Sequence, residues 1–334
     1  MPLLAFVLFD EENKASEHRL LQKSGFLKGY FGMALFHFIN RKKFNSRIKV
    51  FSIENDVEIL TMELPFKLSF LNGLNRHYLT RYISRICMRN SCARCYIPKA
   101  AKWSESFPEH AEDTGTRTIV FKSLLIPVIN RIYRREEARL ENLEIAILCG
   151  EDLCELPTMV KQLEPYVKYI HVASSRKELV ESMLEEISCD SGMPILTSGD
   201  FNSILKTADI AINMGSPTLI SAYRIQRHTL VVNFDTNGSP ILQGVFPTIN
   251  GVEFFFPEEQ YSGFGMEILR NYTKAELTEI LMALKTGLTV RNEYNDISVS
   301  KVLKIFNGNG CRITGVIGRR GVLRPEDVNR AIQM

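Results

Sequence analysis

The sequence predicts an α/β protein: a parallel sheet with helices on both faces in the C-terminal half, preceded by an N-terminal α+β domain. Two observations predict this. Between residues 143 and 235, four short runs of β-branched and apolar residues alternate with helical segments, a pattern typical of βαβ units. Each run is almost continuously apolar, as expected of parallel strands buried on both faces. The runs are IAIL, YIHVA, IAIN and TLVVNF.

The length and charge of the chain limit what it can be. Its 334 residues exceed one typical domain, so two domains are expected. The net charge of +3 is too small to indicate binding to nucleic acid or to a membrane surface. No apolar run approaches the ~20 residues of a membrane-spanning helix. Seven cysteines without an export signal favour reduced thiols, so a cytoplasmic location is expected.

Residues 1–140 are expected to form the first domain, an α+β unit of unassigned family. Its predicted elements are a strand at 2–9, a helix at 20–40, two strands on either side of Asn55 and Asp56, a helix at 68–90, a loop at 96–116 and a helix at 118–139. Pro127 should kink or break that last helix, because proline lacks a backbone donor and clashes with the preceding turn. A charged segment then leads into the second domain, residues 141–334.

The second domain carries consistent helix-start signals. Ser175 with Glu178, and Thr273 with Glu276, each fit a capping box, in which a hydroxyl and a carboxylate satisfy free backbone N–H groups. Short strands and two further helices are expected after residue 235. The glycine- and arginine-rich segment 307–323 is compatible with an anion-binding turn or with a plain strand–turn–strand unit, and the latter is favoured.

The order and length of the elements between residues 143 and 235 resemble the NAD(P)-binding Rossmann-type domain of the shikimate dehydrogenase and glutamyl-tRNA reductase kind. The segment ADIAINMGSP, at the fourth strand, is similar to a signature that such domains carry there. The segment VASSRKE is similar to the end of their second strand, where a small polar residue and an arginine meet the adenosine 2′-phosphate. The resemblance covers about a third of the chain and implies a catalytic domain followed by a dinucleotide domain.

The first turn of this domain departs from the family pattern. A dinucleotide-binding turn has the form G-x-G-x-x-G, because glycines let backbone amides approach the pyrophosphate. Here only Gly150 remains, and Glu151 and Asp152 place two negative charges where the pyrophosphate would lie. Either the dinucleotide binds in an altered pose, or the fold is kept and the dinucleotide is lost.

The end of the second strand favours NADP over NAD. Ser174, Ser175, Arg176 and Lys177 follow the strand, and the first acid is Glu178. Arginine and lysine suit a 2′-phosphate, whereas an NAD site offers a carboxylate to the ribose. The alternative is a solvated helix start capped by Ser175.

Two further positions complete the predicted cofactor site. Gly215 and Ser216, after the fourth strand, would lie near the nicotinamide ribose in such a fold. The alternative for this pair is a turn followed by a helix cap.

Cys87, Cys92 and Cys95 have the C-x4-C-x2-C spacing of the first three ligands of a plant-type [2Fe–2S] site. Zinc is a second option and a nucleophilic thiol a third. Cysteines as small apolar residues near a helix end are the commoner outcome, so no bound metal is expected.

The leading hypothesis is an NADP-dependent oxidoreductase that acts in the cleft between the two domains. Its expected substrate is a small or carrier-bound anionic molecule, which would suit Arg81, Arg85 and Arg89 on one helical face. The favoured alternative for these arginines is a solvated face or a contact with acidic residues of a partner. The sequence does not indicate a catalytic proton donor, and it leaves a homo-oligomer open. The alternatives are a non-catalytic binding or scaffold protein that has lost the dinucleotide site, and a metal or iron–sulfur protein.

Overall fold

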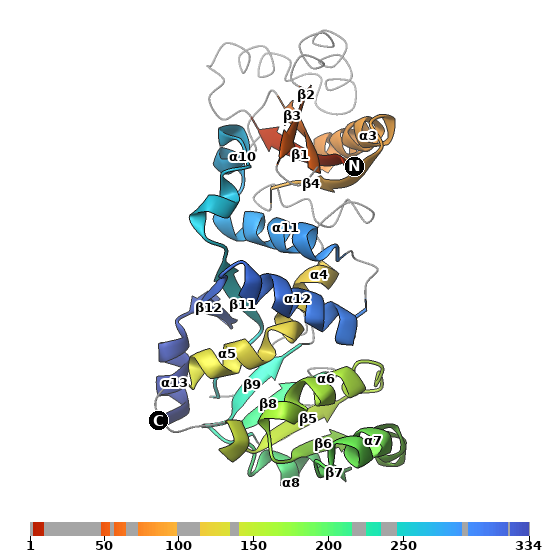
Figure 1. Ribbon diagram of the computed structural model, residues 1–334, viewed down its shortest axis with the longest axis vertical. Coiled ribbons are helices and arrows are strands. Elements are labelled where there is room, and N and C mark those ends of the chain that lie inside the picture. Colours follow the sequence, from red (N-terminus) through yellow and green to blue (C-terminus); the bar gives the residue numbers. More distant parts are fainter. Residues whose placement is uncertain are drawn as a thin grey trace. The chain divides into compact units, whose positions relative to one another are not determined.

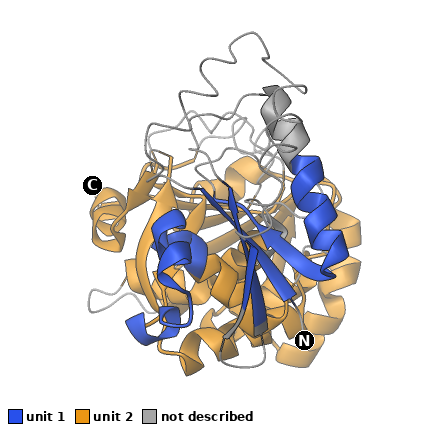
Figure 2. Cartoon of the chain, turned by 90° about the horizontal axis from the view of Figure 1, so that it is seen from above, with its two compact units in different colours: residues 1–113, 258–277 blue, residues 114–257, 278–334 orange. Residues whose placement is uncertain are grey.

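The computed structural model describes residues 3–9, 48–53, 57–64, 73–98, 114–133, 140–215, 225–234, 246–288, 293–319 and 321–333. The chain divides into two compact units, which Figure 2 colours separately. Unit 1 is Met1–Asp113 with Glu258–Leu277, and unit 2 is Thr114–Pro257 with Thr278–Met334. These units do not follow the expected boundary between residues 140 and 141. No helix within the described ranges combines the length and apolar character needed to cross a membrane.

Unit 2 is built on a six-stranded parallel sheet (Figure 1). Its strands are β5 (Ile145–Cys149), β6 (Ile170–Ser174), β7 (Ile195–Ser198), β8 (Ile210–Asn213), β9 (Leu230–Asn233) and β10 (Thr248–Ile249). The strands lie in the order β10-β9-β8-β5-β6-β7, which is the Rossmann order 3-2-1-4-5-6 read from the other edge. The predicted α/β fold class is confirmed.

Burial explains why the strand runs could be read from the sequence. All five residues of β5 and all four of β8 are buried, because the sheet is covered on both faces. At the edge, β7 leaves Leu196 about half exposed. All four predicted apolar runs become strands.

Helices connect the strands and cover the sheet. They are α6 (Leu156–Leu163), α7 (Lys177–Ser191) and α8 (Phe201–Leu205), with the 3₁₀ turns η4 (Leu140–Asn142) and η5 (Glu164–Tyr166). The apolar side of α8 packs against small residues of one sheet face, including Ala146 and Ala211. The connections through α6 and α7 run along the sheet from β5 towards β7, whereas α8 leads back from β7 to β8. Because such crossovers are right-handed, α6 and α7 lie on the face of the sheet opposite to α8.

A pair of helices precedes the sheet in unit 2. They are α4 (Thr114–Ser123) and α5 (Leu125–Ile132), and the break between them lies at Leu124. Pro127 falls in the first turn of α5, where its missing N–H is not needed. The predicted interruption by Pro127 is confirmed.

A second, antiparallel sheet completes unit 2. It consists of β11 (Gly251–Phe255), β12 (Arg312–Gly318) and β13 (Gly321–Leu323), with α12 (Asp296–Gly308) and α13 (Pro325–Gln333) beside it in sequence. The strands β12 and β13 pair as a hairpin that turns back at Gly321, whose φ of 119° is a glycine conformation. The favoured strand–turn–strand interpretation of this segment is confirmed.

Unit 1 contains a four-stranded mixed sheet in the order β2-β3-β1-β4. The strands are β1 (Leu3–Phe9), β2 (Ile48–Ile53), β3 (Val57–Leu64) and β4 (Cys92–Tyr96), with α3 (Gly73–Arg89) between β3 and β4. The predicted pairing on either side of Asn55 and Asp56 is confirmed, since Ile53 opposes Val57 in an antiparallel ladder. The turn residues themselves, and the helix expected at 20–40, lie outside the described residues.

A distant segment joins this sheet through its side chains. It holds η6 (Glu258–Tyr261), α10 (Met266–Asn271) and the first turn of α11 (Lys274–Thr286). The Tyr272 hydroxyl contacts the carbonyl oxygens of Val7 at 3.0 Å and Tyr96 at 2.7 Å. The Asn271 side chain accepts a hydrogen bond from the Phe9 amide at 2.7 Å. These contacts explain why the segment belongs to unit 1.

The two predicted capping boxes have different outcomes. At α11, the Thr273 amide donates to Glu276 Oε2 at 2.7 Å and the Glu276 amide donates to Thr273 Oγ1 at 3.3 Å, so that box is confirmed. The box at Ser175 is wrong. The residue that precedes α7 is Arg176, and it makes no side-chain capping bond. The turn after β6 uses Ser174 instead, as described below.

Candidate functional site

The candidate site is the carboxyl edge of the six-stranded sheet. From β5 the chain proceeds to β6 and β7 on one side, whereas β8, β9 and β10 lie on the other side. Ligands of open α/β sheets bind in the crevice where the strand order reverses in this way. The register pairs Cys149 with Ser174 and Leu148 with Asn213. It therefore aligns the predicted positions Gly150, Ser174 and Gly215 along one edge.

The loop after β5 uses its backbone donors internally. Gly150 is half-buried, and six residues separate the strand from α6. The Cys154 amide donates to Asp152 Oδ1 at 3.0 Å, and the Leu156 amide donates to the Leu153 carbonyl at 3.1 Å. Pro157 has no amide hydrogen to offer at the start of α6. A pyrophosphate bound in the family manner would need such donors, so this loop is poorly equipped for it.

The loop is also negatively charged. Glu151 and Asp152 are both exposed. The hydrogen bond from the Cys154 amide holds the pKa of Asp152 below its usual value, with a smaller contribution from Lys122. Asp152 therefore stays ionised down to lower pH than a free aspartate, and its charge is present at neutral pH.

A buried lysine holds the last residue of this loop. Lys122, near the end of α4, is only 7% exposed and forms an ion pair with Glu155. Its ammonium lies 5.9 Å from the ring centre of Phe234 and 5.5 Å from that of Tyr294. Both separations are within the range of cation–π attraction. We call Lys122, Glu155, Gln162, Phe234 and Tyr294 the Lys122 cluster.

Hydrogen bonds complete the Lys122 cluster. The Tyr294 hydroxyl donates to Gln162 Oε1, and Gln162 Nε2 donates to the carbonyl oxygens of Lys122 and Ser123 at 3.1 and 2.9 Å. Burial raises the pKa of Tyr294, so its hydroxyl keeps its proton. No sequence motif indicates this cluster. A signal was present, because Lys122 is the only charged residue between positions 118 and 130.

The end of β6 presents the basic residues expected for a 2′-phosphate. Ser174 is buried, and its hydroxyl accepts a hydrogen bond from the Arg176 amide at 3.1 Å. Ser175, Arg176 and Lys177 are exposed at the start of α7. The Lys177 ammonium lies 3.4 Å from Glu181, one helical turn further on. Arg176 is therefore the stronger candidate for binding an anion at this position.

A chain of side-chain amides crosses the other half of the edge. Asn213, at the end of β8, is fully buried, and its Nδ2 donates to Asn233 Oδ1 at 2.8 Å. Asn233 Nδ2 in turn donates to Asn250 Oδ1 at 3.1 Å. Asn213 Oδ1 accepts the Gly215 amide at 3.2 Å, which fixes the residue after the strand. Ser216, the last predicted site residue, lies outside the described residues.

Replacing Asn213 by alanine should lower the free energy of unfolding by about 1–2 kcal/mol, because it removes two hydrogen bonds of a buried side chain, one to Asn233 and one from the Gly215 amide. Urea denaturation followed by circular dichroism measures this change. Asn202→Ala on the exposed side of α8 is the control, with an effect below about 0.5 kcal/mol. Equal stabilities for Asn213→Ala and the parent would contradict the structural role of the amide chain.

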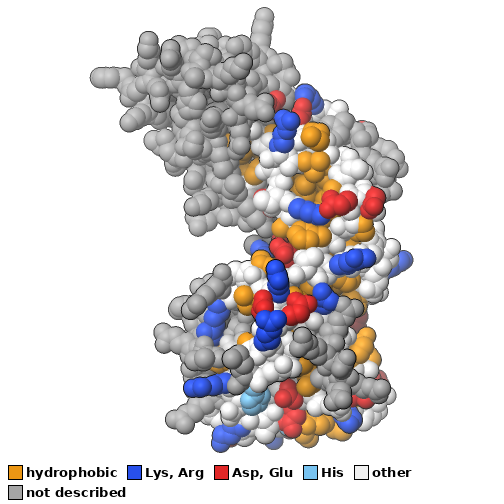
Figure 3. Space-filling view, turned by 90° about the vertical axis from the view of Figure 1, so that its left-hand side faces the viewer, with side chains coloured by type: hydrophobic (Ala, Val, Ile, Leu, Met, Phe, Trp, Pro, Cys, Tyr) orange, Lys and Arg blue, Asp and Glu red, His pale blue; other side chains and the backbone are white. Residues whose placement is uncertain are grey.

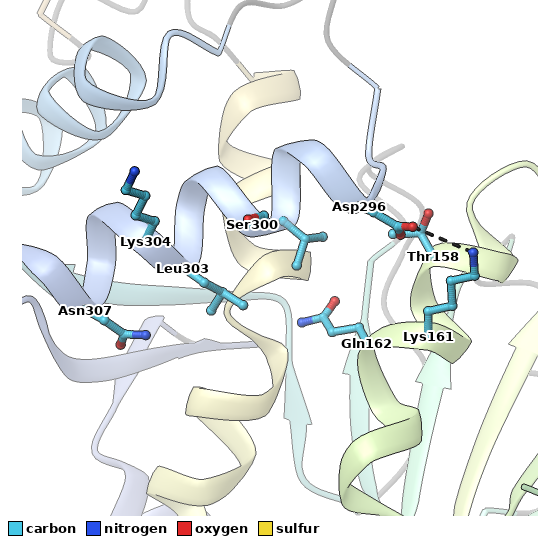
Figure 4. A pocket seen from close by; sticks show the side chains of 9 residues that line it. Thr158, Lys161, Gln162, Asp296, Ser300, Leu303, Lys304 and Asn307 are labelled. Carbon is cyan, nitrogen blue, oxygen red and sulfur yellow. Dashed lines mark ion pairs between the residues drawn. The ribbon is translucent and has the colours of Figure 1, made fainter. Parts of the chain in front are cut away.

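A groove of about 480 Å³ lies between α6 and α12 (Figure 4). Its lining includes Lys161 and Gln162 from α6 and Asp296 and Lys304 from α12. Lys161 and Asp296 form an ion pair of 3.8 Å across it. All of its lining residues come from these two helices, so the groove is separate from the strand ends.

Surface charges and cysteines add two observations. On the face shown in Figure 3, acidic and basic side chains of the described residues lie next to one another, in keeping with a net charge of only +3. The cysteines at 87, 92 and 95 are free thiols. Within the described part of the chain, no group of three or more histidine, cysteine, aspartate or glutamate residues is arranged to hold a metal ion.

Comparisons with known proteins assign no family to the chain. No protein-family model matches the chain, and no curated protein matches it. Among solved structures, shikimate dehydrogenase from Mycobacterium tuberculosis is 10% identical with a TM-score of 0.32, covering 91% of this chain and 100% of that one. The ligand-free 5-ketofructose reductase of a Gluconobacter strain is 12% identical with a TM-score of 0.32, covering 92% and 99%.

A third structure, Δ1-pyrroline-2-carboxylate reductase from Thermococcus litoralis in complex with NADH and L-proline, is 17% identical with a TM-score of 0.28 and covers 37% of each chain. Likenesses of this size do not indicate an activity. The Rossmann-type fold of unit 2 follows from its own strand order. The narrower resemblance to shikimate dehydrogenase and glutamyl-tRNA reductase stays a prediction.

Proposed function

We propose that this chain is an NADP-dependent oxidoreductase that binds its dinucleotide along the carboxyl edge of the six-stranded sheet. The observation that carries the proposal is the end of β6, where exposed Arg176 and Lys177 stand beside the buried Ser174. In a sheet of this order, that position faces the adenosine ribose. Two cations and a serine suit a 2′-phosphate, whereas the first carboxylate comes only at Glu178.

The pyrophosphate is the part of the ligand that this edge receives least well. The loop amides of Cys154 and Leu156 are engaged, and the carboxylates of Glu151 and Asp152 are exposed. Binding is therefore expected to be weak and to rely on the ribose phosphate and on the residues after β8. The substrate that we propose is a small or carrier-bound anionic molecule, in keeping with the exposed Arg81, Arg85 and Arg89 of α3.

A second function is favoured by the Lys122 cluster. The ion pair between Lys122 and Glu155 ties the loop after β5 to α4, and the internal hydrogen bonds keep that loop closed without a ligand. This arrangement suits a binding or scaffold protein that has kept the fold and lost the dinucleotide.

Titration with NADPH and NADH, followed by calorimetry, separates the two functions. NADPH should bind more tightly than NADH, and Arg176→Ala should lower the affinity for NADPH about tenfold while leaving that for NADH unchanged, because one charge-assisted hydrogen bond is worth ~1.4 kcal/mol or more. The matched control is Lys168→Ala, which removes an exposed charge just before the amino end of the same strand. Absence of binding by both nucleotides would favour the scaffold function.

A further inference from the structure

Three cysteines of unit 1 meet where α3 leads into β4. Cys87 lies in the last turn of α3, and Cys92 and Cys95 lie in β4. The connection is a tight turn in which Ser91 adopts a left-handed φ of 52°. The Asn90 side chain closes the helix by donating to the Ile86 carbonyl at 2.8 Å. The turn brings the start of the strand back alongside the end of the helix.

An irregularity in β4 places Cys92 and Cys95 on the same face of the sheet. Residues three apart on a regular strand point to opposite faces. In the pairing with β1, however, Leu3 opposes Cys92, Leu4 opposes Arg94 and Ala5 opposes Cys95. The extra residue, Ala93, is a β-bulge that resets the alternation. Cys92 and Cys95 therefore both share the face of Leu3 and Ala5.

Cys87 lies against that same face. It belongs with Cys95, Ala5 and Val7 to one buried apolar cluster, and Cys92 packs against the edge of the cluster. Cys87 and Cys95 are 2% and 1% exposed, whereas Cys92 is partly exposed. The three thiols differ in access although they are neighbours.

The thiols are close enough to affect one another's ionisation. A hydrogen bond from Cys95 lowers the pKa of Cys87, and a second from Cys92 adds to this, although burial opposes it. Burial, followed by the negative charge at Cys87, raises the pKa of Cys92 to about 12. The hydrogen bond to Cys87 and burial raise the pKa of Cys95 as well. Of the three, Cys87 is the thiol that loses its proton most readily, and its thiolate lies next to the Cys92 thiol.

We propose that Cys92 and Cys87 form a thiol-oxidation site that reacts with peroxides, in which Cys92 receives the oxidant and Cys87 closes a disulfide with it. Partial exposure gives Cys92 access to a small peroxide. Its neighbour Cys87 belongs to the buried cluster against which Cys92 packs, so Cys87 is shielded from bulk oxidants and adjacent to Cys92. This site is independent of the dinucleotide edge and of the function proposed above.

The reaction balances with one peroxide. The Cys87 thiolate takes the proton of the Cys92 thiol as the Cys92 sulfur attacks a peroxide oxygen. The O–O bond breaks, giving a sulfenic acid and a hydroxide that takes a proton from solvent and leaves as water when the oxidant is hydrogen peroxide. The Cys87 sulfur then attacks the Cys92 sulfur, the S–O bond breaks, and a second water leaves with the thiol proton. Two electrons pass from the thiols to the peroxide, and a dithiol reductant reverses the change.

Peptide mapping tests the site, because trypsin separates the three cysteines. Cleavage after Arg85, Arg89, Arg94 and Lys99 gives the peptides 86–89, 90–94 and 95–99, with one cysteine each. After treatment with excess hydrogen peroxide at mildly alkaline pH, we expect peptides 86–89 and 90–94 to be joined by a disulfide. Dithiothreitol should release them. The exposed Cys154 and Cys189 of unit 2 serve as internal controls for general oxidation.

Variants assign the roles of the thiols. In Cys87→Ser, Cys92 should accumulate as a dimedone-reactive sulfenic acid and the linked peptides should disappear. In Cys92→Ser, Cys87 should stay reduced, and Cys95→Ser should still form the link. The proposal is overturned if Cys87 and Cys92 remain reduced after Cys154 and Cys189 have been oxidised. A link from peptide 86–89 to peptide 95–99 as the main product would overturn it equally, because Cys95 would then be the partner.

Discussion

Replacing Lys122 by methionine is expected to lower the free energy of unfolding by about 2–3 kcal/mol. Methionine keeps the apolar stem but removes the ammonium that pairs with Glu155 and lies over the rings of Phe234 and Tyr294. Breaking a fully buried ion pair costs about 3–5 kcal/mol, because one charge is left without a partner. The Lys122 side chain is 9% exposed, but that of Glu155 is 36% exposed. Water can therefore solvate the Glu155 carboxylate that is left without a partner, and the expected loss of stability is smaller than for a fully buried pair.

A double-mutant cycle with Glu155→Gln separates the ion pair from the ring contacts. If most of the stabilisation comes from the ion pair, Lys122→Met should lower the free energy of unfolding much less in the Glu155→Gln background than in the parent. Lys161→Met is the matched control, because its ion pair with Asp296 is 3.8 Å long and more than half exposed on both sides. That control should change stability by less than about 0.5 kcal/mol. Equal stabilities for Lys122→Met and the parent would show that the Lys122 cluster does not hold the loop.

The double variant Glu151→Gly, Asp152→Ser is expected to bind NADPH at least tenfold more tightly than the parent. Each acid at ~5 Å from a phosphate contributes about 1–3 kcal/mol of repulsion before salt screening. Both side chains are exposed, so screening reduces this figure, but a net gain of ~1.4 kcal/mol is already tenfold. Serine at position 152 can still accept the hydrogen bond from the Cys154 amide, which preserves the turn.

Calorimetry at two salt concentrations measures this effect, and the gain should shrink at high salt. The control Glu185→Gln, Glu186→Gln removes the same net charge from exposed positions on α7. A loss of affinity in the loop variant would mean that the acids contact ribose hydroxyls or a cation, which supports an altered binding pose. Absence of binding by the parent and by the variant would favour the scaffold function.

The sequence by itself determined the parallel sheet of unit 2 and the break between α4 and α5. Strands buried on both faces must be apolar throughout, so β5 and β8 could be read directly from IAIL and IAIN. The break at Leu124, ahead of Pro127, follows from the local chemistry of proline. The positions along the carboxyl edge followed as well, because parallel strands end at the same edge. In each case the signal lies within a few consecutive residues.

Only the tertiary structure decided which residues meet from distant parts of the chain. Tyr272 joins unit 1 because its hydroxyl meets backbone carbonyls of β1 and β4, a contact between residues more than 170 positions apart. The Lys122 cluster likewise brings together side chains from four separate segments of the chain. Cys92 and Cys95 share a face only because pairing with β1 creates the bulge at Ala93. Strand register and long-range hydrogen bonds depend on the partner segment, and the periodicity of a single segment does not contain that information.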